Sequence, residues 1–272
     1  MTARSDAGLP LLAWVTDRVI LGATRHPIPA EGKSRHLLSL PEIGQLEIWI
    51  SRVGPENAVD PDIYVLKFPG TASRAEDPTD ALAHWWPERC VEIWSVNPPG
   101  YGSSSGSPSL RNFPSMSRIA LEALRIQADG IPVVLYGESL GCVSSLHLGA
   151  RHPVDAILLR DPPPLRETMR SRHDTGILGW IAGLLAEHIP EELDTIENAG
   201  RSSAPAVMVL SQQDRVVPFD LQCRVSDAYF GPRRSLVLTG ANHGDPPTQN
   251  ELGEFKVLTR WLWDTMENER KS

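Results

Sequence analysis

The sequence predicts an α/β protein with a mostly parallel central sheet and helices on both faces of that sheet. Apolar runs of strand length alternate with segments of helical pattern along most of the chain, as expected for repeated strand–helix–strand units. Residues 133–136 are apolar or aromatic at every position, which is typical of a strand buried on both faces. A short turn bounded by glycines follows at residues 137–141 and leads directly into a helical pattern. These three observations place strand, turn and helix in the order that a parallel sheet requires.

The other elements can be assigned in chain order. Residues 45–51 alternate polar and apolar side chains, as in a strand with one face in water. Runs rich in apolar residues predict further strands at 63–68, 91–96, 156–159, 206–211 and 235–239, and segments of helical pattern predict helices at 78–89, 115–128, 140–152 and 219–230. A final helix is expected after Thr248 and Glu251, whose spacing is that of a capping box.

The domain organisation follows from length and from one interruption. A chain of 272 residues is long enough for one large domain and too short for two large domains. Residues 1–33 are interpreted as an N-terminal arm and a linker rich in proline and glycine, and residues 34–272 as the domain itself. Within that domain, residues 165–204 break the strand–helix alternation, which predicts a small cap inserted over one end of the sheet.

Composition excludes several classes of protein. The chain is 41% hydrophobic and 22% charged with a net charge of −8, as in an ordinary globular protein. No dense cluster of Lys or Arg indicates a nucleic-acid surface. No secretory signal or run of membrane-spanning length is recognisable. The three cysteines, Cys90, Cys142 and Cys223, are too far apart for a zinc or redox motif, and their small odd number favours the reducing cytoplasm.

The turn at residues 137–141 reads Gly-Glu-Ser-Leu-Gly and has the G-x-S-x-G form. Such a turn holds its central serine, here Ser139, in a strained backbone, and the glycines remove side chains that would collide with the adjoining strand and helix. The five residues alone fit equally well an ordinary corner between strand and helix with a capping serine. The flanking strand and helix favour the interpretation of Ser139 as a nucleophile.

A nucleophilic serine needs a base and a group that orients the base, both at the carboxyl ends of strands. His243 follows the strand at 235–239, and Asp214 follows the strand at 206–211. Asp161 also follows a strand and is the alternative acid, but the three prolines after it indicate a rigid exit, which favours Asp214. The order Ser139, Asp214, His243 is the one expected when the turn supplies the nucleophile.

With these three motifs, the chain resembles the α/β-hydrolase superfamily over roughly residues 40–268. The resemblance implies an eight-stranded, mostly parallel sheet and hydrolysis of an ester, thioester or similar bond without metal or cofactor. It also implies that the loop at 97–106 supports the site structurally. The backbone N–H of Leu140 is expected to form one side of the oxyanion hole. By position, Thr71 supplies the second donor, although Pro69-Gly70 stands where members often have His-Gly.

The expected function is therefore a serine hydrolase that cleaves a carboxylic ester, or next a thioester, of a small acyl substrate through an acyl-enzyme. Other reactions on the same fold, such as a lyase or perhydrolase reaction, remain an alternative. A non-catalytic binding protein is a further alternative, but it would need none of the three residues. Glu138 is a candidate pocket residue. In the apolar stretch at 177–185, Trp180 is the candidate for contact with the acyl group, unless the whole stretch packs on the core.

Overall fold

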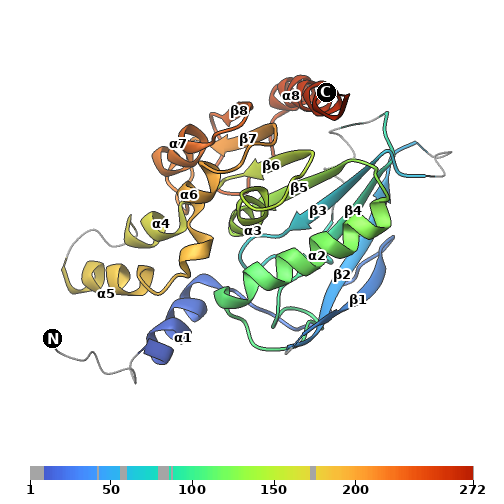
Figure 1. The fold of residues 1–272 in the computed structure, drawn as a ribbon. Helices are drawn as coiled ribbons and strands as arrows, with labels where there is room; N and C mark the ends of the chain where they lie inside the picture. The colour runs from blue at the N-terminus through green and yellow to red at the C-terminus, as the bar shows by residue number, and fades with distance from the viewer. Residues whose placement is uncertain are drawn as a thin grey trace.

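The computed structural model of the chain describes residues 9–41, 43–55, 60–78, 86, 88–171 and 176–271. Its centre is an eight-stranded sheet in the order β1-β2-β4-β3-β5-β6-β7-β8 (Figure 1). The strands are β1 (Ser34–Leu40), β2 (Gly44–Val53), β3 (Ile63–Phe68), β4 (Val91–Asn97), β5 (Val133–Glu138), β6 (Ala156–Arg160), β7 (Ala206–Ser211) and β8 (Arg233–Leu238). β2 pairs antiparallel with β1 and β4, and all other neighbours are parallel. The predicted mostly parallel α/β sheet is confirmed.

Helices cover both faces of this sheet. They are α1 (Leu9–Ile20), α2 (Phe113–Ala128), α3 (Gly141–Gly149), α4 (Leu165–Ser171), α5 (Gly176–Ala186), α6 (Thr195–Ala199), α7 (Phe219–Ala228) and α8 (Gln249–Lys271), with short 3₁₀ turns η2 (Leu110–Asn112) and η3 (Glu191–Leu193). Side chains of α2 and α3 share one hydrophobic cluster, and side chains of α8 belong to another on the opposite face. In β5, Val133 and Leu135 join the first cluster, whereas Val134 and Tyr136 join the second. Because successive side chains of a strand point to opposite faces, a strand covered on both sides is apolar throughout.

The last helix begins as its sequence predicts. The backbone N–H of Thr248 donates to the Glu251 carboxylate at 2.8 Å, and the Glu251 N–H donates to Thr248 Oγ1 at 3.4 Å. This reciprocal pair satisfies two backbone donors that a helix N-terminus otherwise leaves without partners. The predicted capping box is confirmed, and α8 extends over one face of the sheet from this point (Figure 1).

The edge of the sheet formed by β1 and β2 differs from the prediction in two ways. β1 was not expected, because most of its side chains are exposed and its sequence carries little apolar alternation. The prediction of one wet face for β2 is wrong at Glu47, which is only 1% exposed. The carboxylate of Glu47 accepts hydrogen bonds from Asn97 Nδ2 and the Ser103 N–H, at 2.7 and 2.8 Å. The loop after β4 therefore covers this strand.

The N-terminal helix α1 lies beside α5, at one end of the molecule (Figure 1). Thr16 Oγ1 in α1 donates a hydrogen bond to the backbone oxygen of Leu185 in α5 at 3.1 Å. Most of the helix predicted at 78–89 lies outside the described residues, as do residues 1–8 of the predicted arm and residues 172–175 of the predicted cap. None of the helices in the described ranges is both long enough and apolar enough to cross a membrane.

Candidate active site

Ser139 lies in a strained turn between β5 and α3. Its φ of +49° falls in the left-handed region, which residues other than glycine rarely occupy. The backbone holds this conformation from both sides: the Ser139 N–H donates to the Arg160 oxygen at 2.8 Å, and the Ser139 oxygen accepts from the Cys142 N–H at 2.9 Å. The serine side chain therefore projects from the carboxyl end of the sheet at the start of a helix.

The two glycines of the turn are required by close backbone contacts. A Cβ atom on Gly137 would lie 2.5 Å from the Cα of Cys142, inside the first turn of α3. A Cβ atom on Gly141 would lie 1.9 Å from the backbone oxygen of Phe68, at the end of β3. Both distances are far below van der Waals contact. The predicted collision with the adjoining helix is confirmed for Gly137, whereas the strand that a side chain on Gly141 would meet is the neighbouring β3 and not β5.

Ser139, His243 and Asp214 form one chain of hydrogen bonds. His243 Nε2 lies 2.9 Å from Ser139 Oγ, and His243 Nδ1 lies 2.6 Å from Asp214 Oδ2. Asp214 follows β7 and His243 follows β8, so the two loops bring these side chains to the end of the sheet where Ser139 stands. The arrangement allows the ring to accept a proton from the serine while the carboxylate holds its other nitrogen.

Asp214 is itself fixed by the loop that carries it. Its Oδ1 accepts hydrogen bonds from the backbone N–H groups of Val216 and Val217, at 2.7 and 2.8 Å. Its Oδ2, the atom that faces His243, also accepts from Gln222 Nε2 at 2.9 Å. Four hydrogen-bond contacts on one buried carboxylate leave it little freedom to rotate, so the orientation of the imidazole ring is fixed as well.

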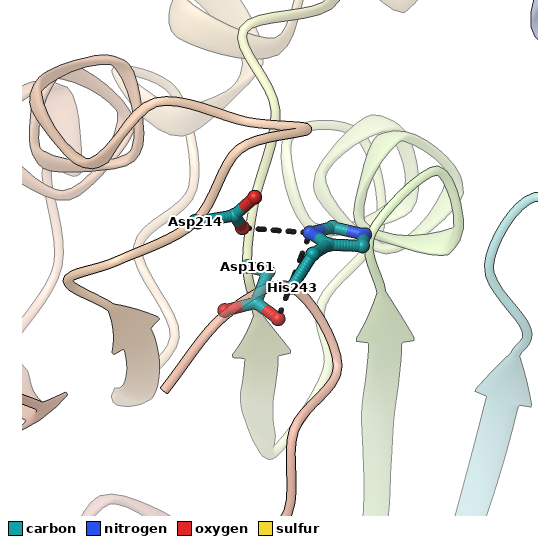
Figure 2. A group of neighbouring side chains, drawn as sticks. All are labelled: Asp161, Asp214 and His243. Carbon is teal, nitrogen blue, oxygen red and sulfur yellow. Dashed lines mark hydrogen bonds and ion pairs between the residues drawn. The ribbon is translucent and has the colours of Figure 1, made fainter. Parts of the chain in front are cut away.

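A second carboxylate faces the same histidine. Asp161 Oδ2 lies 3.8 Å from His243 Nδ1, and both acidic side chains point to this nitrogen in Figure 2. The two acids that the sequence left in competition therefore meet at one ring, with Asp214 1.2 Å closer. Burial alone would lower the pKa of His243, but the hydrogen bond and charge of Asp214, with the charge of Asp161, raise it above its usual value.

These three residues also form a group in which one ligand atom from each lies within 4.8 Å of the others. Such a group could hold a metal ion by proximity alone. In this structure, however, both ring nitrogens of His243 already have partners within the protein, Asp214 at Nδ1 and Ser139 at Nε2. The hydrogen-bonded chain accounts for the short distances.

A cavity of about 450 Å³ opens beside Ser139 and His243. Of the oxyanion candidates, Leu140 and Thr71 both line it, together with Gly70. A Cβ atom on Gly70 would lie 3.3 Å from the Cβ of Ser139, so the loop after β3 passes close to the serine. Residues from both loops thus border the space next to the hydroxyl.

Glu138, the other pocket candidate, also lines this cavity. Its Oε2 lies 3.1 Å from Lys67 Nζ, and its Oε1 accepts a hydrogen bond from the Tyr136 hydroxyl. Burial alone would raise the pKa of Glu138, but the Lys67 charge and these hydrogen bonds hold it below its usual value. The cavity wall beside the serine therefore carries an ionised carboxylate paired with a lysine that is only 6% exposed.

The prediction for Trp180 is wrong. The residue is 69% exposed, and it is absent from the residues that line the cavity. α5 instead buries Ala182, Leu185 and Ala186. Residues two positions apart on a helix of 3.6 residues per turn lie on nearly opposite faces, so burial of Ala182 directs Trp180 outward.

Other residues of the predicted cap, and residues of the predicted N-terminal arm, line the cavity in place of Trp180. α4 contributes Leu165, Thr168 and Met169, and α1 contributes Val19 and Ile20. The sequence did not identify them as pocket residues, because their role depends on where α1 and α4 pack. The available signal for Val19 was its helical spacing from Leu11, Leu12 and Val15, which would fall on one face of a helix.

The chain is similar in sequence to several known proteins over little more than half of its length. No protein-family model matches the chain. An uncharacterized protein of Mycobacterium tuberculosis is 29% identical over 172 residues, which are 61% of this chain and 58% of the relative. Alpha/beta hydrolase domain-containing protein 17B of Xenopus laevis is 30% identical over 155 residues, which are 56% of this chain and half of the relative. The matched region thus spans little more than half the length of these curated relatives.

Solved structures with the same fold include two esterases. Est1E from Butyrivibrio proteoclasticus, solved with ferulic acid bound, superposes with a TM-score of 0.65 at 13% identity, over 85% of this chain and 99% of Est1E. An esterase of Pyrococcus furiosus gives a TM-score of 0.63 at 10% identity, over 92% of this chain and 97% of that structure. The chain is a member of the α/β-hydrolase superfamily. Membership in the α/β-hydrolase superfamily confirms the resemblance found in the sequence and the predicted fold class.

Proposed function

We propose that the chain is a serine hydrolase that cleaves carboxylic esters, with thioesters as the next substrate class, through an acyl-enzyme intermediate. The observation that carries this proposal is the continuous chain Ser139 Oγ–His243 Nε2 and His243 Nδ1–Asp214 Oδ2, at 2.9 and 2.6 Å. A binding protein would gain nothing from a strained serine aligned with a base and a carboxylate. The esterases among the structures of the same fold add support.

In the proposed reaction, Ser139 Oγ attacks the acyl carbon while its proton passes to His243 Nε2. Asp214 remains ionised and stabilises the imidazolium that forms. His243 then returns the proton to the leaving alcohol, and a water molecule activated by the same ring hydrolyses the acyl-enzyme. No metal or cofactor takes part in this scheme.

The negative charge on the carbonyl oxygen needs backbone donors beside Ser139. We assign this role to the N–H groups of Leu140 and Thr71. Leu140 precedes α3 directly, so the dipole of that helix also favours a negative charge there. Thr71 belongs to the loop after β3, whose neighbouring Gly70 packs against the serine.

The cavity favours a small ester with an apolar acyl group. Its volume of about 450 Å³ falls in the usual range for small-molecule sites. Apolar side chains on its walls come from α1, α4 and the loop after β7, among them Ile20, Leu165, Met169 and Val217. We also propose that residues 165–204 act as the small cap expected from the sequence, with α4 as the part that meets the substrate.

An activity-based probe tests this proposal. A fluorophosphonate reacts only with a serine that a base activates, so we expect the wild-type protein to be labelled and Ser139→Ala to remain unlabelled. Ser73→Ala is the matched control, because Ser73 lines the same cavity but forms no hydrogen-bonded chain with a histidine in the part of the chain that the structure describes. Its labelling should equal that of wild type. An unlabelled wild-type protein with intact fold would favour the lyase, perhydrolase or binding alternatives.

Substrate class is then measured with p-nitrophenyl esters of increasing chain length and with acyl thioesters. We expect Ser139→Ala to lower kcat/KM by about 10⁴ or more while leaving the unfolding free energy nearly unchanged, since the hydroxyl contributes chemistry and little packing. Turnover by Ser139→Ala at a tenth of the wild-type rate would contradict the assignment of the nucleophile.

A further inference from the structure

Asp161 has three properties that an ordinary loop residue after a strand would not need together. Its side chain is buried, with 1% of the residue exposed. Its φ of +49° lies in the left-handed region, and its Oδ1 has no hydrogen-bond partner among the described residues. A strained backbone and a buried carboxylate oxygen without a donor both cost free energy. Such costs are tolerated where the arrangement serves a site.

The other carboxylate oxygen of Asp161 contacts the loop of the histidine at two points. Oδ2 accepts a hydrogen bond from the Gly244 N–H at 3.0 Å, and it lies 3.8 Å from His243 Nδ1. Gly244 directly follows His243, so this one oxygen fixes the backbone next to the ring and faces the ring itself. Figure 2 shows the carboxylates of Asp161 and Asp214 on the same side of the His243 ring, both directed at its Nδ1 atom.

We propose that Asp161 is a second carboxylate partner of His243, a positioning residue that holds the histidine loop through Gly244 and adds its charge to that of Asp214. This inference rests on the proposed serine-hydrolase function. When the Ser139 proton reaches Nε2, the ring gains a positive charge, which the two carboxylates beside Nδ1 stabilise. No proton or bond passes to Asp161; its effect on the reaction is electrostatic and geometric.

The charges around the ring come from the loops after β6 and β7 and from the last residue of β6. Asp214 from the loop after β7 and Asp161 from the loop after β6 both favour the imidazolium. Arg160 opposes them: its Nε lies 3.8 Å from Asp161 Oδ2, and its Nη2 donates to the backbone oxygen of Asp245 in the histidine loop. Arg160 offsets part of the Asp161 charge. The pKa of His243 is nevertheless raised, because the two carboxylates outweigh this opposing charge.

The variant Asp161→Asn separates the charge from the structural contact. Asparagine tolerates positive φ as aspartate does, and its amide oxygen can still accept from the Gly244 N–H. Asp245→Asn is the matched control. Asp245 is an exposed acid in the loop that carries His243, and its carboxylate accepts a hydrogen bond from the Asn242 N–H. Each variant removes one negative charge, but only Asp161 faces the ring.

The first measurement is an NMR titration of the His243 ring, assigned by its loss in His243→Gln. We expect the pKa of His243 to be lower in Asp161→Asn than in wild type, and unchanged in Asp245→Asn. An unchanged value in Asp161→Asn, or an equal decrease in both variants, would overturn the inference. This titration needs no turnover, so it is readable even if the protein proves not to be a hydrolase.

The second measurement is a double-mutant cycle on ester hydrolysis. We expect Asp161→Asn to lower kcat/KM about tenfold, as for the loss of a contact with a charged group, and to shift its pH midpoint downward. Asp214→Asn should be far more damaging, yet retain at least about tenfold more activity than the double variant, because Asp161 remains beside Nδ1. Equal activity of the double variant and Asp214→Asn would contradict a shared histidine.

Folding and function are controlled separately. Asp161→Gly removes the carboxylate and also relieves the positive φ, so it serves if Asp161→Asn does not fold, with the same expected decrease in the pKa of His243. A wild-type protein that the fluorophosphonate does not label would refute the proposed function alone. A labelled Ser139 together with an unchanged His243 titration would refute the role of Asp161 alone.

Discussion

Replacement of Gly141 by alanine tests whether the turn around Ser139 depends on a backbone contact with β3. The added Cβ atom would lie 1.9 Å from the Phe68 oxygen and 2.9 Å from the Pro69 oxygen. Acceptable contact requires a separation of 3 Å or more, so the end of β3 and the start of α3 must move apart by about 1 Å. Both opposing atoms belong to the backbone, and no side-chain rotation can relieve the overlap.

The expected cost follows from that geometry. Inserting one carbon into a packed region typically costs 1–3 kcal/mol, and we expect about 3 kcal/mol here because the backbone must yield. The loop that moves carries Thr71, the proposed oxyanion donor. Since a misplacement of about 1 Å can lower a rate about 10²-fold, we expect inactivation of Ser139 by a fluorophosphonate to slow by a similar factor.

The assay combines urea unfolding with the rate of fluorophosphonate labelling. Gly253→Ala is the control, because a Cβ atom at this position in α8 would meet no atom of the described residues within 4 Å. Alanine is favoured over glycine in a helix interior, so Gly253→Ala should stabilise the protein by up to about 1 kcal/mol and leave labelling unchanged. If Gly141→Ala kept the wild-type unfolding free energy and labelling rate, the contact with Phe68 would not shape the site.

Three further predictions follow from the site. kcat/KM should rise with pH through one midpoint, because imidazolium cannot accept the serine proton, and this midpoint should lie above about 6.5, the usual pKa of histidine, because two carboxylates raise the pKa of His243. A rate independent of pH, with chemistry rate-limiting, would argue against a histidine base. Met169→Ala should enlarge the cavity and raise kcat/KM for esters with an acyl chain two carbons longer by roughly tenfold relative to kcat/KM for short-chain esters, because each buried methylene contributes about 0.8 kcal/mol. Trp180→Ala, the exposed control, should leave this ratio of long-chain to short-chain kcat/KM unchanged. Lys67→Met should destabilise the protein by about 2 kcal/mol, measured by urea unfolding, because the partly buried Glu138 carboxylate loses its partner. A Lys67→Met, Glu138→Gln double variant should recover most of that loss.

Features that depend on local sequence were predictable. The turn around Ser139 needs two glycines at fixed positions, and its neighbours must form a strand and a helix, so five residues and their flanks define it. Asp214 and His243 could be placed because the ends of parallel strands meet at one edge of the sheet. The choice between Asp161 and Asp214 was posed correctly as a competition, but the sequence could not show that both reach the same nitrogen.

Features that depend on packing between distant segments were not predictable. Glu47 resembles a solvent-facing residue until the loop after β4 folds over it and supplies its donors. Trp180 resembles a pocket residue because its neighbours are apolar, and only the burial of Ala182 settles which face of α5 points inward. Val19 belongs to a helix that precedes the first strand, and no local pattern relates it to a serine 120 residues later in the chain.

The position of α1 separates the size of the substrate site from its chemistry. Val19 and Ile20 form part of the cavity wall, yet they come before β1 and interrupt none of the crossovers that position the reacting side chains. A combinatorial library confined to this helix could therefore widen or narrow the substrate range while the distances among serine, histidine and carboxylates stay constant. Mutations that change specificity would then fall in a different part of the gene from the residues that set the rate. This separation makes the scaffold suited to directed evolution of new acyl preferences.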